Sequence, residues 1–350
     1  MANNTVNISA SNPASYLYAL SVNAPDKVLF TEANIELTAK ALYKKASGLN
    51  HFLAQSGVSA GDNIAIFLPR GMDAVIAIYA VLMTGACYIP LDTSGPQARN
   101  LFIIKDACCR SIVSNDQAPK WLADSGIVTI NTDMLPSVSL QEPPGALYSQ
   151  PDAPAAILYT SGSTGNPKGV VISQRAISAF VQWASNVFNL NVQDVAASLS
   201  PFHFDLSLFD LFAVPAAGAN TVFIPDALKL SPSRLTDWLA QNTISLWYTV
   251  PSILVFIALK GGLDKKNLPQ LKQILFAGEV FPMDSLIRLT GLLPETKFYN
   301  LFGPTETNVC LYWPVDRKRL TAGEDIPVGY PACEAELGID PEQGELLVKG

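Results

Sequence analysis

The N-terminal third of the chain alternates between apolar runs of two lengths. "DNIAIFLP" and "CYIPLD" have the length of buried strands, and residues 74–83 between them form a run long enough for a helix. Residues 37–55, further upstream, have the spacing of an amphipathic helix. Strands that alternate with helices are typical of an α/β fold with a largely parallel sheet. The sequence therefore predicts an α/β lobe at this end of the chain.

The continuous apolar stretch at residues 74–91 also raises the possibility of a membrane span. Thr84, Gly85 and Pro90 interrupt it, which favours a buried helix followed by a buried strand. The polar start, "MANNTVNISASNPAS", lacks the order of a signal peptide. The five cysteines form no CxxC pair, so neither a disulfide framework nor a zinc site is indicated. We expect a cytoplasmic protein that has no membrane partner.

A proline- and serine-rich stretch, "LPSVSLQEPPGALYSQPDAP", predicts a surface connection after the first lobe. The alternation of strands and helices then resumes, and Ser231 followed by Pro232 predicts the start of a helix. Beyond Trp313 only short β segments follow. We therefore expect a first α/β lobe at about 1–150, a second at 151–313, and the start of a β-rich region at 314–350.

The composition supports a large globular core, because 49% of the 350 residues are hydrophobic and only 15% are charged. The formal net charge of −7 leaves no basic stripe for displacing counterions from nucleic acid. A nucleic-acid partner is therefore not expected.

A loop rich in glycine and hydroxyl groups, "YTSGSTGNPKGVV", lies between two strand-like segments. Glycines let backbone N–H groups turn toward an anion, while hydroxyls add donors and Lys168 adds positive charge. It is not a Walker A motif, because neither Ser nor Thr follows Lys168, and it is not a dinucleotide fingerprint. An inert surface loop is the simpler alternative for this composition. The order of strand, polar loop, Pro-Lys-Gly and strand favours a phosphate loop in a hairpin.

Three further segments, "FHFDLSLFDLF", "LFAGEVF" and "YNLFGPTET", place small or polar residues at or near predicted strand ends. Ligands in open α/β sheets collect at the carboxyl ends of strands. Taken singly, Asp205 fits a helix start, Gly278 a tight turn, and Gly303 a turn before Thr305. Their combination predicts a binding site.

In this order, "LMTGACYIPLD", "YTSGSTGNPKG", "FDLSLFDLF", "NLFGPTE" and "GELLVKG" resemble the adenylate-forming enzymes. This superfamily comprises acyl- and aryl-CoA synthetases, luciferases and the adenylation domains of non-ribosomal peptide synthetases. The resemblance implies an α/β fold of two packed sheet subdomains plus a small β-rich region. Such enzymes continue with a Thr-Gly-Asp segment and a mobile C-terminal domain carrying a catalytic lysine. The chain lacks both, so we expect it to be the large N-terminal lobe, with weak or no adenylation by itself.

The resemblance also implies the chemistry: ATP and Mg²⁺ serve to activate an amino acid as aminoacyl-AMP, with release of pyrophosphate. The acyl group then passes to the phosphopantetheine thiol of a peptidyl carrier protein. Lys168, Thr305 and Glu306 would be catalytic, with Thr305 at the α-phosphate and Glu306 as the Mg²⁺ ligand. Phe302 stands where the family usually has tyrosine. The ATP-binding residues implied are Thr160, Ser161, Gly162, Ser163, Thr164, Gly165, Lys168, Gly278, Glu279, Asn300, Leu301, Phe302, Gly303 and Thr305.

Asp205 occupies the place where amino-acid-activating members carry an aspartate for the substrate ammonium. The substrate-binding residues implied are Asp205, Leu206, Phe209, Tyr248, Leu275, Ala277, Leu301, Val309 and Cys310. Apart from Asp205 they are apolar or aromatic, which favours a small or medium apolar amino acid. The set resembles enzymes that load L-proline onto a carrier protein in pyrrole- and anatoxin-type pathways. Valine, leucine and pipecolate are alternatives, as are a CoA synthetase and a non-catalytic nucleotide-binding module.

Three other residues have less specific interpretations. His203, two residues before Asp205, either forms a wall of the acid pocket or simply packs there. We expect His51 to be solvated and Cys310 to fill space in the pocket rather than act as a nucleophile. No spacing of Ser, His and Asp or of Cys and His indicates covalent catalysis.

Overall fold

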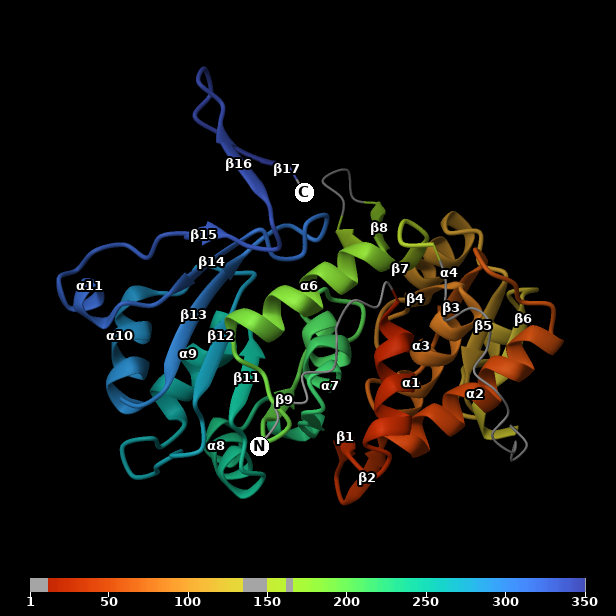
Figure 1. Cartoon of the computed structure of the whole chain (residues 1–350), viewed down its shortest axis with the longest axis horizontal. Coiled ribbons are helices and arrows are strands. Elements are labelled where there is room, and N and C mark those ends of the chain that lie inside the picture. The colour runs from red at the N-terminus through yellow and green to blue at the C-terminus, as the bar shows by residue number, and fades with distance from the viewer. Residues whose placement is uncertain (1–11, 135–149, 162–165, 350) are drawn as a thin grey trace.

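The computed structural model describes residues 12–134, 150–161 and 166–349 (Figure 1). Their strands form one nine-stranded sheet, one six-stranded sheet and one two-stranded sheet. The α/β fold with two large sheets that we expected is therefore confirmed.

The six-stranded sheet is parallel except at one edge. It has the order β6 (Val128–Asn131), β5 (Ser111–Ser114), β3 (Asn63–Ile66), β4 (Cys87–Pro90), β7 (Pro154–Ser161), β8 (Pro167–Ser173). Strands β7 and β8 pair antiparallel, which confirms the hairpin expected around the glycine loop.

The nine-stranded sheet has a parallel centre and antiparallel edges. Its order is β15 (Tyr330–Pro331), β14 (Leu311–Pro314), β13 (Lys297–Phe302), β12 (Gln273–Phe276), β11 (Leu246–Thr249), β9 (Val195–Ser198), β10 (Asn220–Phe223), β1 (Val28–Glu32), β2 (Ile35–Thr38). The N-terminal strands β1 and β2 thus join the sheet built mostly from later residues, while β7 and β8 join the earlier one. Each sheet therefore contains strands from both sides of the boundary expected near residue 150.

The helices connect these strands and cover the sheets (Figure 1). The α-helices are α1 (Pro13–Asn23), α2 (Ala39–Gln55), α3 (Met72–Thr84), α4 (Gln97–Asp106), α5 (Lys120–Ala123), α6 (Gln174–Val187), α7 (Val214–Ala216), α8 (Pro232–Gln241), α9 (Pro251–Lys260), α10 (Met283–Leu292) and α11 (Arg317–Thr321). Two short 3₁₀ helices, η1 (Thr132–Met134) and η4 (Asp226–Leu228), and a π-helix, η3 (Phe209–Ala213), complete them.

The capping residues mark where two of the helices begin. Helix α2 begins at Ala39 rather than at residue 37 as expected, because β2 pairs with β1 up to Thr38, whose hydroxyl accepts from the Ala41 N–H. Helix α8 begins at Pro232 after Ser231, as expected. Among the described residues, no helix combines the length and the apolar character needed to cross a bilayer.

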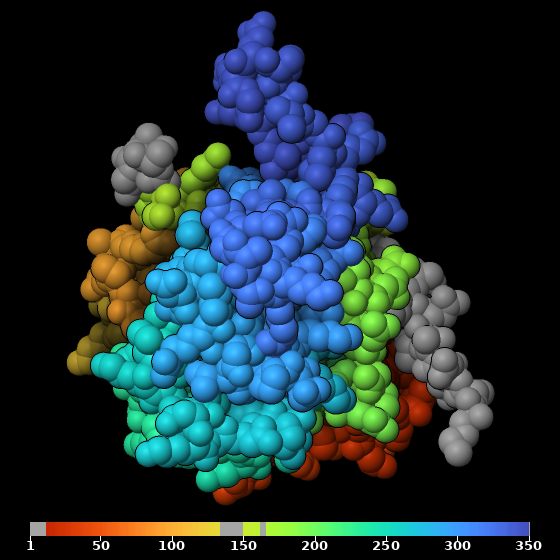
Figure 2. Space-filling model, turned by 90° about the vertical axis from the view of Figure 1, so that its left-hand side faces the viewer, coloured from red at the N-terminus to blue at the C-terminus, as the bar shows by residue number. Residues whose placement is uncertain are grey.

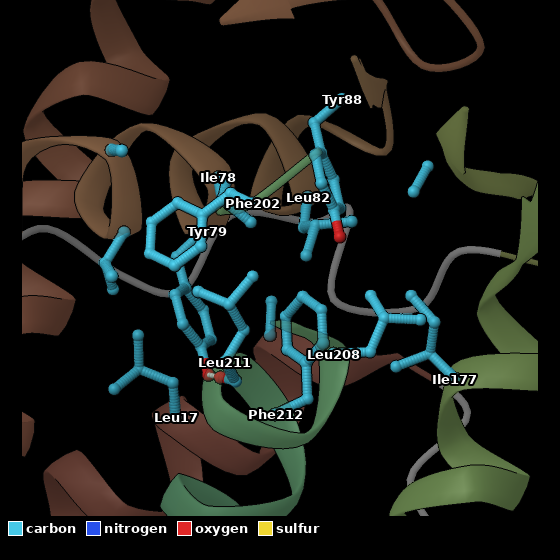
Figure 3. Packing of buried hydrophobic residues seen from close by; sticks show 14 of the residues in the cluster. Leu17, Ile78, Tyr79, Leu82, Tyr88, Ile177, Phe202, Leu208, Leu211 and Phe212 are labelled. Atoms are coloured by element: carbon cyan, nitrogen blue, oxygen red, sulfur yellow. Dashed lines mark hydrogen bonds between the residues drawn. The ribbon is translucent and has the colours of Figure 1, made fainter. Parts of the chain in front are cut away.

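The largest hydrophobic cluster joins the two big sheets. It contains Tyr88 from β4 and Leu275 from β12, and it includes most of α3, whose side chains from Ala74 to Met83 are all buried. Figure 3 shows Tyr79 and Tyr88 facing Phe212 of the π-helix. A helix that is apolar on every side belongs in the interior of a protein. The apolar stretch at 74–91 is accordingly a buried helix followed by a buried strand.

Arg70 adds a polar link between the sheets. It lies in the loop before α3, and its guanidinium donates to the carbonyl of Ser198 at 2.9 Å and to that of Ile224 at 2.5 Å. These carbonyls are at the ends of β9 and β10. Because the Arg70 side chain is only 8% exposed, both hydrogen bonds are sheltered from solvent.

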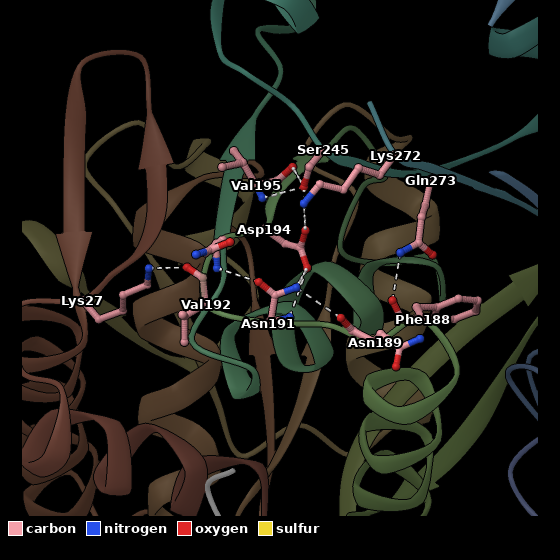
Figure 4. Close-up of polar contacts among 11 residues, drawn as sticks. Lys27, Phe188, Asn189, Asn191, Val192, Asp194, Val195, Ser245, Lys272 and Gln273 are labelled. Carbon is pink, nitrogen blue, oxygen red and sulfur yellow. Dashed lines mark hydrogen bonds and ion pairs between the residues drawn. The ribbon is translucent and has the colours of Figure 1, made fainter. Parts of the chain in front are cut away.

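The opposite end of the nine-stranded sheet is held by Asp194 (Figure 4). Its buried carboxylate accepts from the Asn191 N–H and side-chain amide, and from the Ser245 hydroxyl at 2.9 Å. These contacts lie at the amino ends of the parallel strands. They tie β9 to β11 on the side away from the expected site.

The last two strands, β16 (Glu336–Ile339) and β17 (Leu346–Lys349), form a hairpin that projects from the body of the molecule (Figures 1 and 2). Leu337, Ile339, Leu346 and Leu347 are exposed on it. A two-stranded sheet of this kind has little stability of its own in water.

Candidate active site

The residues expected at the site converge on the carboxyl ends of the parallel strands. Strands β9, β11, β12 and β13 run in parallel, so their carboxyl ends lie at one edge of the sheet. The segment with His203 and Asp205 follows β9, Gly278 follows β12, and the turn with Thr305 follows β13. This edge is where an open α/β sheet binds its ligands.

The β7–β8 hairpin contributes the phosphate-loop residues. Thr160 pairs with Lys168 and Ser161 with Pro167 across the hairpin. The Lys168 side chain is exposed. Gly162, Ser163, Thr164 and Gly165 lie outside the described residues.

The expected nucleotide wall comes from the segments after β12 and at the end of β13. Gly278 has φ +90°, a left-handed conformation that suits glycine, and Phe302 is 44% exposed. Asn300 is half-buried and its amide donates to the Pro327 carbonyl at 3.2 Å. The Glu279 carboxylate accepts from the Ser252 N–H at 3.0 Å and therefore caps the N-terminus of α9. The exposed ring of Phe302 is accessible as a stacking surface.

The expected acid pocket is assembled from four separate parts of the sequence. Phe209, Tyr248, Leu275, Ala277, Leu301 and Val309 are buried members of the largest hydrophobic cluster, and Leu206 packs against it. Cys310 is 1% exposed, and Phe209 and Tyr248 pack edge to face with ring centroids 5.6 Å apart. The structure thus brings the apolar lining residues together.

Asp205 is half-buried and belongs to the same region. Burial raises the pKa of its carboxyl, the Thr305 hydroxyl and the Leu206 N–H oppose this, and the Glu306 carboxylate raises the pKa further. Burial also raises the pKa of Tyr248, with a smaller contribution from Asp205. The carboxylate therefore lies beside the Thr305–Glu306 turn and near Tyr248, one of the expected lining residues. No basic side chain forms an ion pair with it in the part of the chain that the structure describes.

The turn after β13 has a tight backbone. The Thr307 N–H donates to the Pro304 carbonyl, and a Cβ atom at Gly303 would lie 2.3 Å from the Asn308 carbonyl oxygen. Only glycine fits there without a shift of the backbone. The turn presents Glu306 with its side chain exposed.

Asp210 is a buried carboxyl that the sequence analysis missed. It is 1% exposed in the π-helix, and neither carboxylate oxygen has a hydrogen-bond partner among the described residues. Burial raises its pKa to about 7, and the positive charge of nearby Arg70 opposes the shift. An aspartate inside the apolar run "LSLFDLFAV" was the available signal.

His203 is half-buried and packs against the Phe204 ring in a tilted arrangement, with centroids 4.6 Å apart. Burial lowers its pKa, the Asp92 carboxylate raises it, and Arg99 and Lys229 lower it. It lines a cavity of about 340 Å³ together with Arg70, Asp92 and Lys229. His203 thus lines this cavity, and its expected role as a wall of the acid pocket stays a prediction. His51 is exposed, as expected.

The sequence is similar to those of curated proteins, among them two carrier-protein ligases. The chain is 35% identical over 84% of its length to an L-proline–[L-prolyl-carrier protein] ligase of Streptomyces coelicolor, covering 60% of that protein. It is 32% identical over 93% of its length to the L-proline–[L-prolyl-carrier protein] ligase of Pseudomonas fluorescens, covering 69% of it. The chain thus spans about two thirds of the length of these curated relatives.

The fold also matches solved structures. An AMPPNP-bound non-ribosomal peptide synthetase, FmoA3, superimposes with a TM-score of 0.85 at 24% identity, covering 97% of this chain and 37% of that one. The architecture is therefore that of the N-terminal lobe of adenylation domains. The family model described as "AMP-binding enzyme" matches residues 20–350. On these grounds the chain belongs to the AMP-binding enzymes of the adenylate-forming superfamily.

Proposed function

We propose that this chain is the large lobe of a ligase that uses ATP to activate an amino acid and then loads it onto a carrier protein. The observation that carries the proposal is the position of Asp205. Its carboxylate has no ion-pair partner among the described residues and lies beside the Thr305–Glu306 turn, near the apolar residues expected to line the acid pocket. A partly buried carboxylate is costly without a cation, so the arrangement suits an ammonium group on the substrate.

The first step joins the acid to AMP. A carboxylate oxygen of the substrate attacks the α-phosphorus of ATP, the bond to the β-phosphate oxygen breaks, and pyrophosphate leaves. Lys168, next to the loop of the hairpin, would stabilise the negative charge that develops on the leaving group. Thr305 would contact the α-phosphate, and Phe302 would stack on the adenine.

Glu306 fits the role of a magnesium ligand. Mg²⁺ is usually held by one or two carboxylates together with phosphate oxygens and water. Glu306 is an exposed oxygen donor beside the expected position of the phosphates. Bound there, Mg²⁺ would neutralise part of the phosphate charge.

The second step transfers the acyl group. The thiol of a phosphopantetheinylated peptidyl carrier protein attacks the acyl carbon, a thioester forms, and AMP leaves. Two relatives are named for L-prolyl-carrier proteins, which supports a carrier as the partner here. We place this chemistry in the cytoplasm, in a pathway of the anatoxin or pyrrole type.

L-Proline is the substrate that we propose. The pocket lining is apolar apart from Asp205 and the Tyr248 hydroxyl, so a second charge on a substrate side chain would lack a partner. Proline is compact, apolar and cationic at its nitrogen. The names of two relatives support the same choice.

We also keep the division of the chain into lobes near residues 150 and 313 as a proposal.

Amino-acid-dependent ATP–pyrophosphate exchange by the full-length protein tests the function. Exchange dominated by L-proline across the proteinogenic amino acids and pipecolate is the expected result. Exchange with another amino acid would refute the choice of proline. Exchange with none, together with AMP formation from a fatty or aromatic acid and CoA, would favour a CoA synthetase.

A further inference from the structure

Tyr159, near the end of β7, is held at two points by one helix. The Arg99 guanidinium donates to the Tyr159 carbonyl at 3.2 Å, and the Tyr159 hydroxyl donates to the Asp106 carboxylate at 2.7 Å. Arg99 and Asp106 lie about two turns apart on α4, so they share one face of it. Each hydrogen bond involves a charged group, which makes it stronger than a neutral one.

The Tyr159 ring also fixes the opposite strand of the hairpin. Tyr159 pairs with Gly169 across the β7–β8 ladder, and a Cβ atom at Gly169 would lie 3.0 Å from the ring. The ring is therefore packed directly over the backbone of Gly169. The next pair along the ladder is Thr160 with Lys168.

The hydroxyl of Tyr159 is kept as a donor. Burial raises the pKa of Tyr159, and the hydrogen bond and negative charge of Asp106 raise it further. The side chain is 8% exposed. The phenol thus stays protonated at neutral pH and can hold the Asp106 carboxylate.

From these contacts we propose that Arg99, Asp106 and Tyr159 form a clamp by which α4 positions the β7–β8 hairpin, and with it Lys168, for the phosphates of ATP. This inference rests on the proposed function. Lys168 is exposed at the base of the loop, so its position depends on the backbone that carries it. Charge stabilisation requires donors that are already in place, and small displacements reduce it strongly.

Two variants test the clamp in the full-length protein. Tyr159→Phe removes only the hydroxyl, whereas Asp106→Asn keeps an oxygen acceptor for it. We expect Tyr159→Phe to raise the KM for ATP in pyrophosphate exchange roughly threefold to tenfold, with the KM for the amino acid unchanged within about twofold. Asp106→Asn should give a smaller rise. Hydrogen exchange of residues 154–173 should become faster in Tyr159→Phe.

Asp152→Asn is the matched control. Asp152 and Arg175 form an ion pair of 2.8 Å at the other end of the same hairpin, but their side chains are 78% and 65% exposed. Such a pair contributes little, so neither KM should change. Equal increases in both KM values for Tyr159→Phe, or no increase in either, would overturn the clamp.

A measurement of nucleotide binding distinguishes failure of the clamp from failure of the proposed function. A fluorescent ATP analogue should bind less tightly to Tyr159→Phe than to the unmodified protein, whatever acid is activated. If the unmodified protein binds the analogue but exchanges with no amino acid, the proposed function fails and the clamp is judged by binding alone. If the unmodified protein does not bind the analogue, both fail.

Discussion

Replacement of Asp205 by asparagine should convert an enzyme selective for amino acids into one that ignores the substrate nitrogen. Asp205 is half-buried, and no described basic side chain forms an ion pair with it, so the substrate ammonium would be its cationic partner. Asparagine keeps the shape of the side chain and removes the charge. The loss should therefore fall on substrates that carry the ammonium.

The size of the expected loss follows from how deeply the Asp205 carboxylate and the substrate ammonium would be buried together. Removing one member of a buried, hydrogen-bonded charge pair costs about 2–5 kcal/mol. Asp205 is only partly buried, so we take about 3 kcal/mol, which corresponds to roughly a hundredfold loss of kcat/KM for L-proline. Cyclopentanecarboxylate has nearly the shape of proline but no nitrogen. Its kcat/KM should stay the same or rise.

The assay is pyrophosphate exchange with L-proline and release of pyrophosphate with cyclopentanecarboxylate, each for the unmodified protein and for Asp205→Asn. The pKa of Asp205 is raised, and only the ionised carboxylate attracts the ammonium. The KM for L-proline should therefore fall as the pH rises through that pKa, and this dependence should vanish in the variant. Equal losses with both acids would refute the assignment of Asp205.

Three further predictions concern buried or tightly packed groups. Because the folded-state pKa of Asp210 is about 7, above its ordinary 3.8, its ionisation should destabilise the fold as the pH rises from about 4 past 7. Asp210→Asn should thus gain about 3 kcal/mol over the unmodified protein between pH 4.5 and 8 in thermal unfolding, and parallel profiles would contradict this. Arg70→Met removes a buried donor from the Ser198 and Ile224 carbonyls, of which Ser198 keeps the Ile224 N–H, and should lower the free energy of unfolding in urea by about 2–4 kcal/mol; a change below 1 kcal/mol would exclude a role in joining the sheets. Gly303→Ala places a Cβ atom against the Asn308 carbonyl, so ATP-dependent activity should fall at least tenfold while the melting temperature changes little, and full activity would show that the turn can adjust.

Much of the fold was accessible from the sequence because strand and helix periods differ. The buried helix at 72–84 and the hairpin around the glycine loop follow from the lengths of the apolar runs and from the glycines and prolines that end them. The pairing of β1 with β10 could not be predicted in this way. It depends on contacts between residues that are distant in the chain, and local patterns carry no information on them.

In the candidate site, too, some residues could be predicted from local sequence patterns and others could not. Asp205, Gly278 and Thr305 were found because each lies in a polar break after an apolar strand. Asp210 and the clamp on Tyr159 were missed because their neighbours are apolar or lie on another element. A π-helix such as η3 also has no distinctive period over five residues.

The parallel pairing of β1 with β10 has a consequence for synthesis on the ribosome. Strand β1 is made early, but its central partner is translated about 190 residues later, which takes roughly 10–40 s at ordinary elongation rates. During this interval the nascent chain exposes β1 with one edge unpaired, ready to bind a chaperone or to aggregate. The nine-stranded sheet should therefore mature late in translation, after the strands of the six-stranded sheet, which end at Ser173, have been made. In a chain cut between residues 173 and 195, β1 and β10 lie on different fragments, so neither fragment should form the nine-stranded sheet by itself.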